Sequence, residues 1–416
     1  MLGGSSAMEL ALDNTDPPQA IVDSHDHVPW LDGLRGGASL WVLISHVNGL
    51  SGGRRIPVLS WGGLAVDLFM LLSGFLMAHH YVLRRDQEPW DKPQTFATFW
   101  LRRFFRIAPL YYLLLAAALL LGPALGEYRE AIERVWPNTA TEAARYSDQS
   151  LANIGAHLSF VFGALPEYAF RTALPDWSIG LEMQFYLAFP FVMLALSRIG
   201  WFRGGILIVL GCLALRFALP GFFGAFEMPS FLPMKMYLFV IGIWMALGRR
   251  QATYRTSLLL SLCTCLVGFA LERTAPAFAR IGLVVGMFYL MDVGRLPTPP
   301  PLAKTISHVR AALSHPIGRF VGDTSYGTYL LHLLVVLPIV GTLATHGEFT
   351  ALPWPVRTVI CLGLSLPLVY TSSWLLYHFV EREGIGAGKR IARALRSREK
   401  LEPLKAPALG GATRTK

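Results

Sequence analysis

A series of apolar stretches, each about 20 residues long, is the feature of this sequence that most constrains its fold. About 20 apolar residues form an α-helix that can cross the hydrocarbon core of a bilayer. The strands of a membrane β-barrel would instead give shorter segments of alternating hydrophobicity. We therefore predict an all-α, polytopic membrane helix bundle. About ten transmembrane helices are expected, at 34–51, 62–83, 104–125, 177–197, 204–221, 232–249, 256–272, 278–293, 324–345 and 355–379.

The composition and charge of the chain support this class. It is 53% hydrophobic and only 15% charged, with a mean hydropathy of +0.44, whereas soluble domains carry about 25% charged residues. The net charge of +10 arises mainly from Lys and Arg in the loops and the tail, which is typical of cytoplasmic membrane faces. We expect the lipid bilayer as a partner, and neither nucleic acid nor a metal ion.

Loop charges also predict a topology. The stretch 151–165 is short and contains Asn153 and His157. If it does not cross, the basic loops all fall on one side, as the positive-inside rule requires. We therefore expect a multi-pass protein of the cytoplasmic (inner) membrane with both termini in the cytoplasm. Residues 1–29 are predicted as a flexible cytoplasmic segment, 30–384 as the transmembrane domain with a long extracytoplasmic loop at 126–176, and 385–416 as a basic cytoplasmic tail.

Arg35 and His46 stand at the two ends of the first apolar stretch. Eleven residues of helix advance about 16 Å and about three turns, so both side chains share one face. Ionisable groups are costly in hydrocarbon and usually mark a working site. A neutral imidazole at His46 could act as a general base, and Arg35 could support a donor molecule. The alternatives are a histidine satisfied by a neighbouring helix and an arginine that anchors the helix end.

The second stretch, GGLAVDLFMLLSGFLM, holds Asp67 and Ser73. A carboxylate inside a membrane needs a partner, so Asp67 is a candidate functional residue. Gly74 shares a face with Asp67 and would let a backbone or a thin substrate approach closely. Ordinary packing of small residues between helices explains Ser73 and Gly74 equally well.

Arg103 and Arg106 are three positions apart and therefore lie on one helix face. Two guanidinium groups at this spacing suit a phosphate or pyrophosphate, although anchoring at the membrane surface is the alternative. Glu381, at the end of the last predicted helix, could pair with Arg35 or with these arginines.

Two further helices carry polar stripes. On the helix predicted at 177–197 the stripe is Ser178, Glu182 and Tyr186, and on that at 324–345 it is Ser325, Tyr329 and His332. A glutamate more than one turn inside a membrane helix is a functional candidate. Hydrogen bonding between helices is the alternative for both stripes.

Together these motifs resemble the acyltransferase-3 family of membrane acyltransferases. The resemblance covers about residues 30–383 and rests on motifs that occur in family order: LDGLR with His46 eleven positions after Arg35, GLAVDLFMLLSGFL, RRFFRIAPLYY, WSIGLEMQFY, SYGTYLLH and a final helix ending in Glu381. It implies transfer of an acyl group, most often acetyl from acetyl-CoA, to a carbohydrate hydroxyl. In the family, residues matching Arg35 and His46 are linked to activity, and those matching Arg103 and Arg106 to acyl-CoA.

The resulting hypothesis is an acyltransferase with acetyl-CoA or another acyl-CoA as donor and a carbohydrate or glycolipid as acceptor. Arg103, Arg106, Arg35 and Ser73 form the expected donor site. His46 is the expected base, and Glu182 or Asp67 would orient the imidazole or the acceptor hydroxyl. The sequence leaves open a transporter or flippase of a lipid-linked sugar, and also a non-catalytic scaffold.

Overall fold

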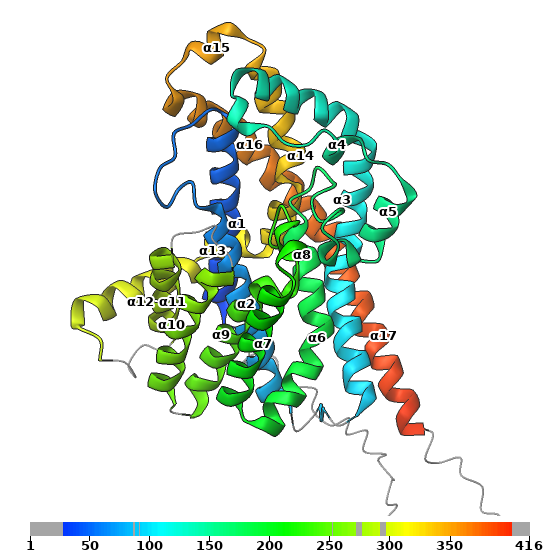
Figure 1. The fold of residues 1–416 in the computed structure, drawn as a ribbon, viewed down its shortest axis with the longest axis vertical. Coiled ribbons are helices and arrows are strands. Elements are labelled where there is room, and N and C mark those ends of the chain that lie inside the picture. The colour runs from blue at the N-terminus through cyan, green and yellow to red at the C-terminus, as the bar shows by residue number, and fades with distance from the viewer. Residues whose placement is uncertain are drawn as a thin grey trace, which may run out of the picture.

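The computed structural model describes residues 28–85, 88–90, 92–251, 253–271, 277–291 and 297–401, and every regular element within them is helical (Figure 1). A helix lies over each of the ten predicted apolar stretches. These helices are α1 (Pro29–Leu50), α2 (Gly62–Arg84), α3 (Pro93–Val135), α6 (Trp177–Ile199), α7 (Trp201–Ala218), α9 (Leu232–Gln251), α10 (Tyr254–Leu271), α11 (Ala277–Met291), α14 (Ser325–Ala344) and α16 (Trp354–Leu376). The all-helical prediction is confirmed.

The number of membrane spans is a separate question. Six helical segments of the described chain are both long and apolar enough to cross a bilayer: Gly62–Arg84, Pro93–Val135, Trp177–Ile199, Trp201–Ala218, Ser325–Ala344 and Trp354–Leu395. The apolar parts of α9, α10 and α11 are shorter. α1 is absent from the six because Asp32, Arg35, His46 and Asn48 interrupt its apolar surface. Six spans are therefore supported by length and composition, and the expected ten stays a prediction.

The loop between α3 and α6 folds at one end of the bundle. It contains η1 (Pro137–Thr139), α4 (Ala144–Ser147), α5 (Leu151–Leu158) and η2 (Val161–Ala164). The eight residues of α5 reach about 12 Å, which is shorter than the roughly 30 Å of a hydrocarbon core. This length favours the expectation that 151–165 does not cross, which stays a prediction. Figure 1 shows α4, α5 and α15 (Gly347–Ala351) at one end, the loop end. α17 (Arg382–Leu401) runs toward the opposite end, the tail end.

α2 and α9 touch backbone to backbone near the bundle centre. A Cβ atom added to Gly74 would lie 2.3 Å from the carbonyl oxygen of Phe239. One added to Gly242 would lie 2.3 Å from the carbonyl oxygen of Leu71. Gly74 thus admits a neighbouring helix, which is the packing alternative considered for the Ser73–Gly74 pair.

α12 (Pro300–Ser314) and α13 (Pro316–Asp323) were not predicted from the sequence, and α13 packs on the first turns of α1. A Cβ atom on Gly36 would lie 2.5 Å from the carbonyl carbon of Val321, and one on Gly322 would lie 2.6 Å from that of Asp32. Gly37, in contrast, faces open space. The close approach at Gly36 fixes the part of α1 that carries Arg35.

Candidate active site

A cavity of about 560 Å³ lies at the loop end of the bundle. His46 on α1 lies in its wall, with Ser45 beside it, and Tyr329 on α14 also lines it. The loop between α3 and α6 closes another side with Arg145 and Phe170, while α3 contributes Arg129 and the start of α6 contributes Trp177. The predicted base therefore faces a space that can hold a small molecule.

His46 forms a pair with His332. The Nδ1 atom of His46 lies 2.9 Å from Nε2 of His332, and the ring centroids are 5.0 Å apart. His332 is fully buried, and its Nδ1 lies 2.7 Å from the carbonyl oxygen of Tyr329. A carbonyl can only accept, so these partners assign the proton of a neutral His332 to Nδ1. Nε2 of His332 then accepts from His46, whose own Nε2 is left unprotonated.

Tyr329 joins α14 to the start of α6. Its hydroxyl donates to the carbonyl oxygen of Pro175 at 2.9 Å and lies 2.7 Å from the hydroxyl oxygen of Ser178. Ser178 therefore donates to Tyr329, because the tyrosine proton is already engaged. Ser325, the remaining residue of the α14 stripe, is also buried. It lies seven positions before His332, about 10 Å along the helix. The structure thus brings His46, His332, Tyr329 and Ser178 together.

A second polar group, the Glu182 cluster, consists of Ser73, Arg103, Glu182 and Tyr186. Ser73 donates to Oε1 of Glu182 at 3.0 Å, and the hydroxyl of Tyr186 donates to the same oxygen. The guanidinium of Arg103 lies over the Tyr186 ring, 5.5 Å from its centroid. Tyr186 and Ser178 are eight residues apart on α6, about 12 Å. The α6 stripe therefore runs from the histidine pair toward the tail end.

Arg106 and Glu381 form an ion pair of 3.3 Å next to this cluster, which confirms one of the pairings considered for Glu381. Glu381 is buried and belongs to η3 (Tyr377–Glu381), a π-helical turn between α16 and α17. Such turns are rare and often occur at functional sites. Arg35 lies close enough for its charge to act on Glu381 and on Tyr186. The structure therefore gathers the expected donor-site residues in one region.

A pocket of about 130 Å³ opens beside Arg103 at the tail end. Arg84 and Arg102 also line it. Both terminal nitrogens of Arg102 are bonded to the carboxylate of Glu88, at 2.9 and 2.6 Å, whereas the buried Nε of Arg103 has no partner. The pocket and the larger cavity share no lining residue. The α6 stripe runs from Ser178, beside the histidine pair, to Tyr186, beside Arg103, and so lies between these two regions.

Asp67 belongs to a different group. Its two carboxylate oxygens accept from Nζ of Lys235 at 2.7 Å and from Nε of Arg280 at 2.9 Å, and all three side chains are buried. This ion triad joins α2 to α9 and α11. Both carboxylate oxygens of Asp67 are thus bonded to cations, and its predicted role in orienting His46 or the acceptor stays a prediction. A lysine and an arginine inside apolar stretches were the sequence signal for these partners.

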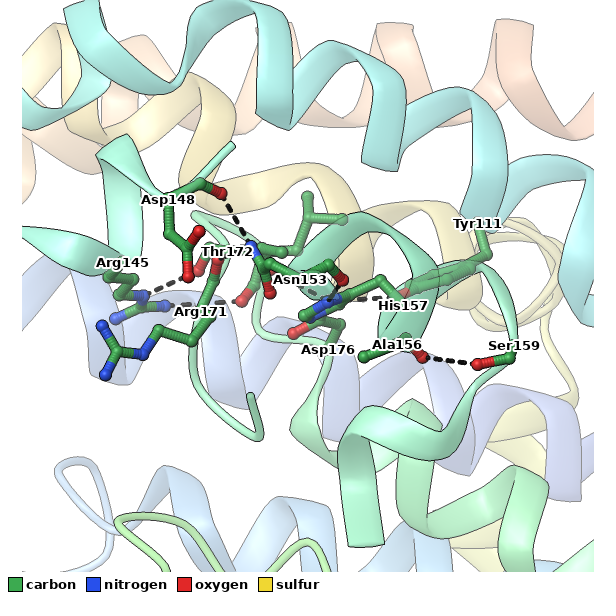
Figure 2. A network of polar contacts seen from close by, with 11 residues as sticks. Tyr111, Arg145, Asp148, Asn153, Ala156, His157, Ser159, Arg171, Thr172 and Asp176 are labelled. Carbon is green, nitrogen blue, oxygen red and sulfur yellow. Dashed lines mark hydrogen bonds and ion pairs between the residues drawn. The ribbon is translucent and has the colours of Figure 1, made fainter. Parts of the chain in front are cut away.

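The loop that closes the cavity is held by its own polar network. Figure 2 shows Arg145, Asn153 and His157 gathered around the segment that leads to Asp176. Arg145 donates from Nε to the carbonyl oxygen of Thr172 at 2.8 Å, and its guanidinium lies 3.7 Å from the centroid of the Phe170 ring. The loop is therefore a folded cap with fixed side chains on the cavity wall.

Asp176 anchors this cap to the bundle just before α6. Its Oδ2 accepts from the hydroxyls of Thr172 at 2.9 Å and Tyr111 at 3.2 Å, and Nε2 of His157 lies 3.6 Å away (Figure 2). Burial raises the pKa of the Asp176 carboxyl, and His157 and the hydrogen bonds oppose this only in part. The cap thus rests on a buried acidic group that binds its proton more tightly than an exposed carboxyl does.

Sequence reasoning did not select Arg129, Arg145 and Trp177, which line the cavity. The two arginines lie in or beside the long loop, where their charges looked like ordinary surface residues. The length of that loop and its aromatic residues were the available signals, because long ordered loops usually have a function.

Comparison with known proteins gives consistent results. Residues 28–374 match the acyltransferase-3 family model, described as an acyltransferase domain. The acyltransferase MdmB of Streptomyces mycarofaciens is 26% identical over 399 residues, covering 88% of this chain and 92% of that protein. A putative O-acetyltransferase of Staphylococcus aureus is 25% identical over 400 residues, covering 87% of this chain and 58% of the relative. The peptidoglycan O-acetyltransferase OatA of Listeria monocytogenes is 22% identical over 351 residues, covering 75% and 50%.

The chain therefore spans only a little over half of the Staphylococcus aureus relative and half of the Listeria protein. No solved structure matches. These relatives are all named as transferases, so neither the transporter nor the scaffold alternative gains support.

Proposed function

Because the chain belongs to the acyltransferase-3 family and is an acyltransferase, we propose that it moves an acyl group, with acetyl as the first candidate, from acyl-CoA to a hydroxyl of a surface or secreted carbohydrate. The observation that carries this proposal is the histidine pair in the cavity wall. Its hydrogen bonds leave Nε2 of His46 unprotonated, as a general base requires.

In the proposed reaction the acceptor binds in the 560 Å³ cavity with its hydroxyl against His46. Nε2 of His46 takes the hydroxyl proton as the oxygen attacks the thioester carbonyl carbon. The carbon–sulfur bond then breaks, and the CoA thiolate leaves and is protonated. His332 holds the His46 ring through the 2.9 Å hydrogen bond and shares the positive charge that His46 acquires. Trp177 and Phe170 offer aromatic faces for a sugar ring.

The donor is proposed to enter at the opposite end of the bundle. Arg103 has a buried, unpartnered Nε and lines the pocket that also contains Arg84. Guanidinium groups bind phosphates through charge-assisted hydrogen bonds. The acyl arm would then pass the Glu182 cluster, whose hydroxyl groups can rotate to new partners, and reach His46. We place the donor end in the cytoplasm and the cavity outside, as loop charges predict.

Substitution of His46 tests this proposal. The full chain, purified in lipid nanodiscs, is incubated with acetyl-CoA and a surface-glycan extract, and acetylated sugar is measured by mass spectrometry. Loss of a general base usually lowers a rate by about 10²–10⁴-fold, so His46→Ala should fall to background while its amount of folded protein stays normal. His346→Ala, an exposed histidine at the same end, should keep full activity. Transfer by His46→Ala at the normal rate would sink the assignment.

A further inference from the structure

The cavity beside His46 is lined by more basic than acidic side chains. Arg55, Arg129 and Arg145 line it, and Glu227 is the acidic side chain among its lining residues. None of these three arginines forms an ion pair with a carboxylate within the described residues. A neutral sugar needs hydrogen bonds and aromatic faces, but it does not need three cations.

Two of these arginines are held in place by uncharged partners. Arg145 is 5% exposed and donates to the carbonyl oxygens of Thr172 and Leu174, at 2.8 and 3.4 Å. Arg129 donates to the carbonyl oxygen of Thr139, and its buried Nε has no partner. Carbonyl oxygens orient a guanidinium but do not neutralise it. Taking a cation out of water is costly, and the charges of Asp176 and Glu227 offset that cost at Arg145 only in part. An anion in the cavity would therefore be favoured at both positions.

Other buried cations of the same molecule are paired with carboxylates. At the ion triad, Lys235 and Arg280 are buried against the carboxylate of Asp67. Arg106 is likewise paired with Glu381. Not every buried arginine is paired in this way, since Arg357 donates to the carbonyl oxygens of Ser51, Gly52, Thr350 and Leu352 and lies over the Trp136 ring. Arg129 and Arg145 differ from Arg357 because they line the cavity, so their charges face the space that the acceptor occupies in the proposed function.

We propose that the acyl acceptor carries an anionic group, a carboxylate or a phosphate, that binds Arg129 and Arg145 while its sugar ring packs on Trp177 and Phe170. This inference rests on the proposed function, since it names the class of acceptor. The charged group anchors the acceptor at the cap, and the hydroxyl that reacts is the one that then reaches His46. Arg55 is exposed at the rim and attracts the anion as it enters.

Binding of matched glycosides tests the proposal without acyl transfer. Methyl glucuronide, methyl glucoside and methyl glucoside 6-phosphate are titrated onto the full chain in nanodiscs, in the absence of acetyl-CoA. Charge-assisted hydrogen bonds to arginine predict that at least one charged glycoside binds about tenfold or more tightly than the neutral one. An equal response to all three glycosides, or none up to their solubility limits, would overturn the proposal.

Substitutions of the cavity arginines test whether they cause the preference for a charged glycoside. Arg129→Gln keeps a donor for Thr139 but removes the charge, so it should lose most of the preference for the charged glycoside, and Arg129→Lys should retain part of it. Arg134→Gln, an exposed residue on the same helix that pairs with Glu130, should behave like the unchanged protein. Arg145→Lys serves as the second cavity variant, because Arg145 also holds the cap. A preference that survives both Arg129→Gln and Arg145→Lys contradicts the proposal.

The phosphates of acyl-CoA are the other source of an anion for these arginines, and a CoA titration separates the two. We expect Arg129→Gln to bind CoA as well as the unchanged protein does, and Arg103→Gln to bind it about tenfold more weakly. Weaker CoA binding by Arg129→Gln, with glycoside binding unchanged, would overturn the proposal. His46→Ala should keep the anion preference although it transfers nothing, so failure of the proposed reaction and failure of this inference give different results.

Discussion

Asp67 and Glu182 are two carboxylates on the inner faces of membrane helices, and they have opposite surroundings. Asp67 is enclosed by two cations, Lys235 and Arg280. Glu182 accepts hydrogen bonds from the neutral hydroxyls of Ser73 and Tyr186. A carboxylate locked between two cations ties helices together and has little freedom to change partners. A carboxylate held by hydroxyl groups can exchange them for other hydrogen-bond partners, because a hydroxyl group can rotate. Position in the sequence did not distinguish these two cases.

The largest expected effect comes from breaking the ion triad of Asp67, Lys235 and Arg280. Asp67→Asn removes the charge that Lys235 and Arg280 share, and breaking a buried ion pair in this way costs about 3–5 kcal/mol of folding free energy. We expect a severe loss of folded protein, measured as the yield of monodisperse protein and its unfolding temperature. Glu130→Gln, at an exposed ion pair, is the control and should change neither.

The same variant can also show that the contrast between Asp67 and Glu182 is wrong. If Asp67→Asn folds with unchanged stability but transfers no acyl group, Asp67 has the catalytic role predicted from the sequence, and the triad is part of the active site.

Glu182→Gln should show the reverse pattern, with a smaller effect. The amide oxygen of glutamine can still accept from Ser73 and Tyr186, so stability should change by less than about 1 kcal/mol. Loss of the negative charge near Arg103 should lower the rate of acyl transfer about tenfold or more. Initial rates and unfolding temperatures on the same samples give both numbers. A variant that is unstable and yet fully active per folded molecule would mean that Glu182 is only structural.

Asp176, the buried carboxyl at the loop end, should give the smallest effect and a dependence on pH. Burial raises its pKa above the ordinary value of 3.8, so the folded chain binds this proton more tightly than the unfolded chain does. Its contribution to stability is full below about pH 4 and is lost as the pH rises through the raised pKa. Asp176→Asn cannot ionise, so its unfolding temperature should lack this decline. Parallel declines in both proteins would assign the pH dependence to other groups.

The sequence could predict the helices because their signal is local. Apolar stretches of about 20 residues are visible in any window of the chain, and the ten expected stretches each hold a helix. Gly74 also carried a local signal, the absence of a side chain, although only the structure shows that α9 fills the space. α12 and α13 escaped prediction because they begin at prolines in a mixed polar segment without a long apolar run.

The partners of the site residues could not be predicted, because they depend on which helices meet. His46 and His332 are 286 positions apart, as the residue numbers of their hydrogen bond show, and no spacing rule connects them. Arg106 and Glu381 were considered as a pair because both were expected at the same membrane face. Opposite charges at the same depth in a membrane can be expected to pair, and these two residues do. Lys235 was overlooked although it is a cation within an apolar stretch, which requires a partner.

The position of the α6 stripe between the cavity and the tail-end pocket bears on how the proposed reaction could cross a membrane. A protein that opened a continuous water-filled pore through a membrane would dissipate the ion gradients across it. Here the cavity and the tail-end pocket have no lining residue in common, and the α6 stripe runs from one toward the other. In the proposed reaction the acyl group would pass along the side chains of this stripe, and such a pore would not be required.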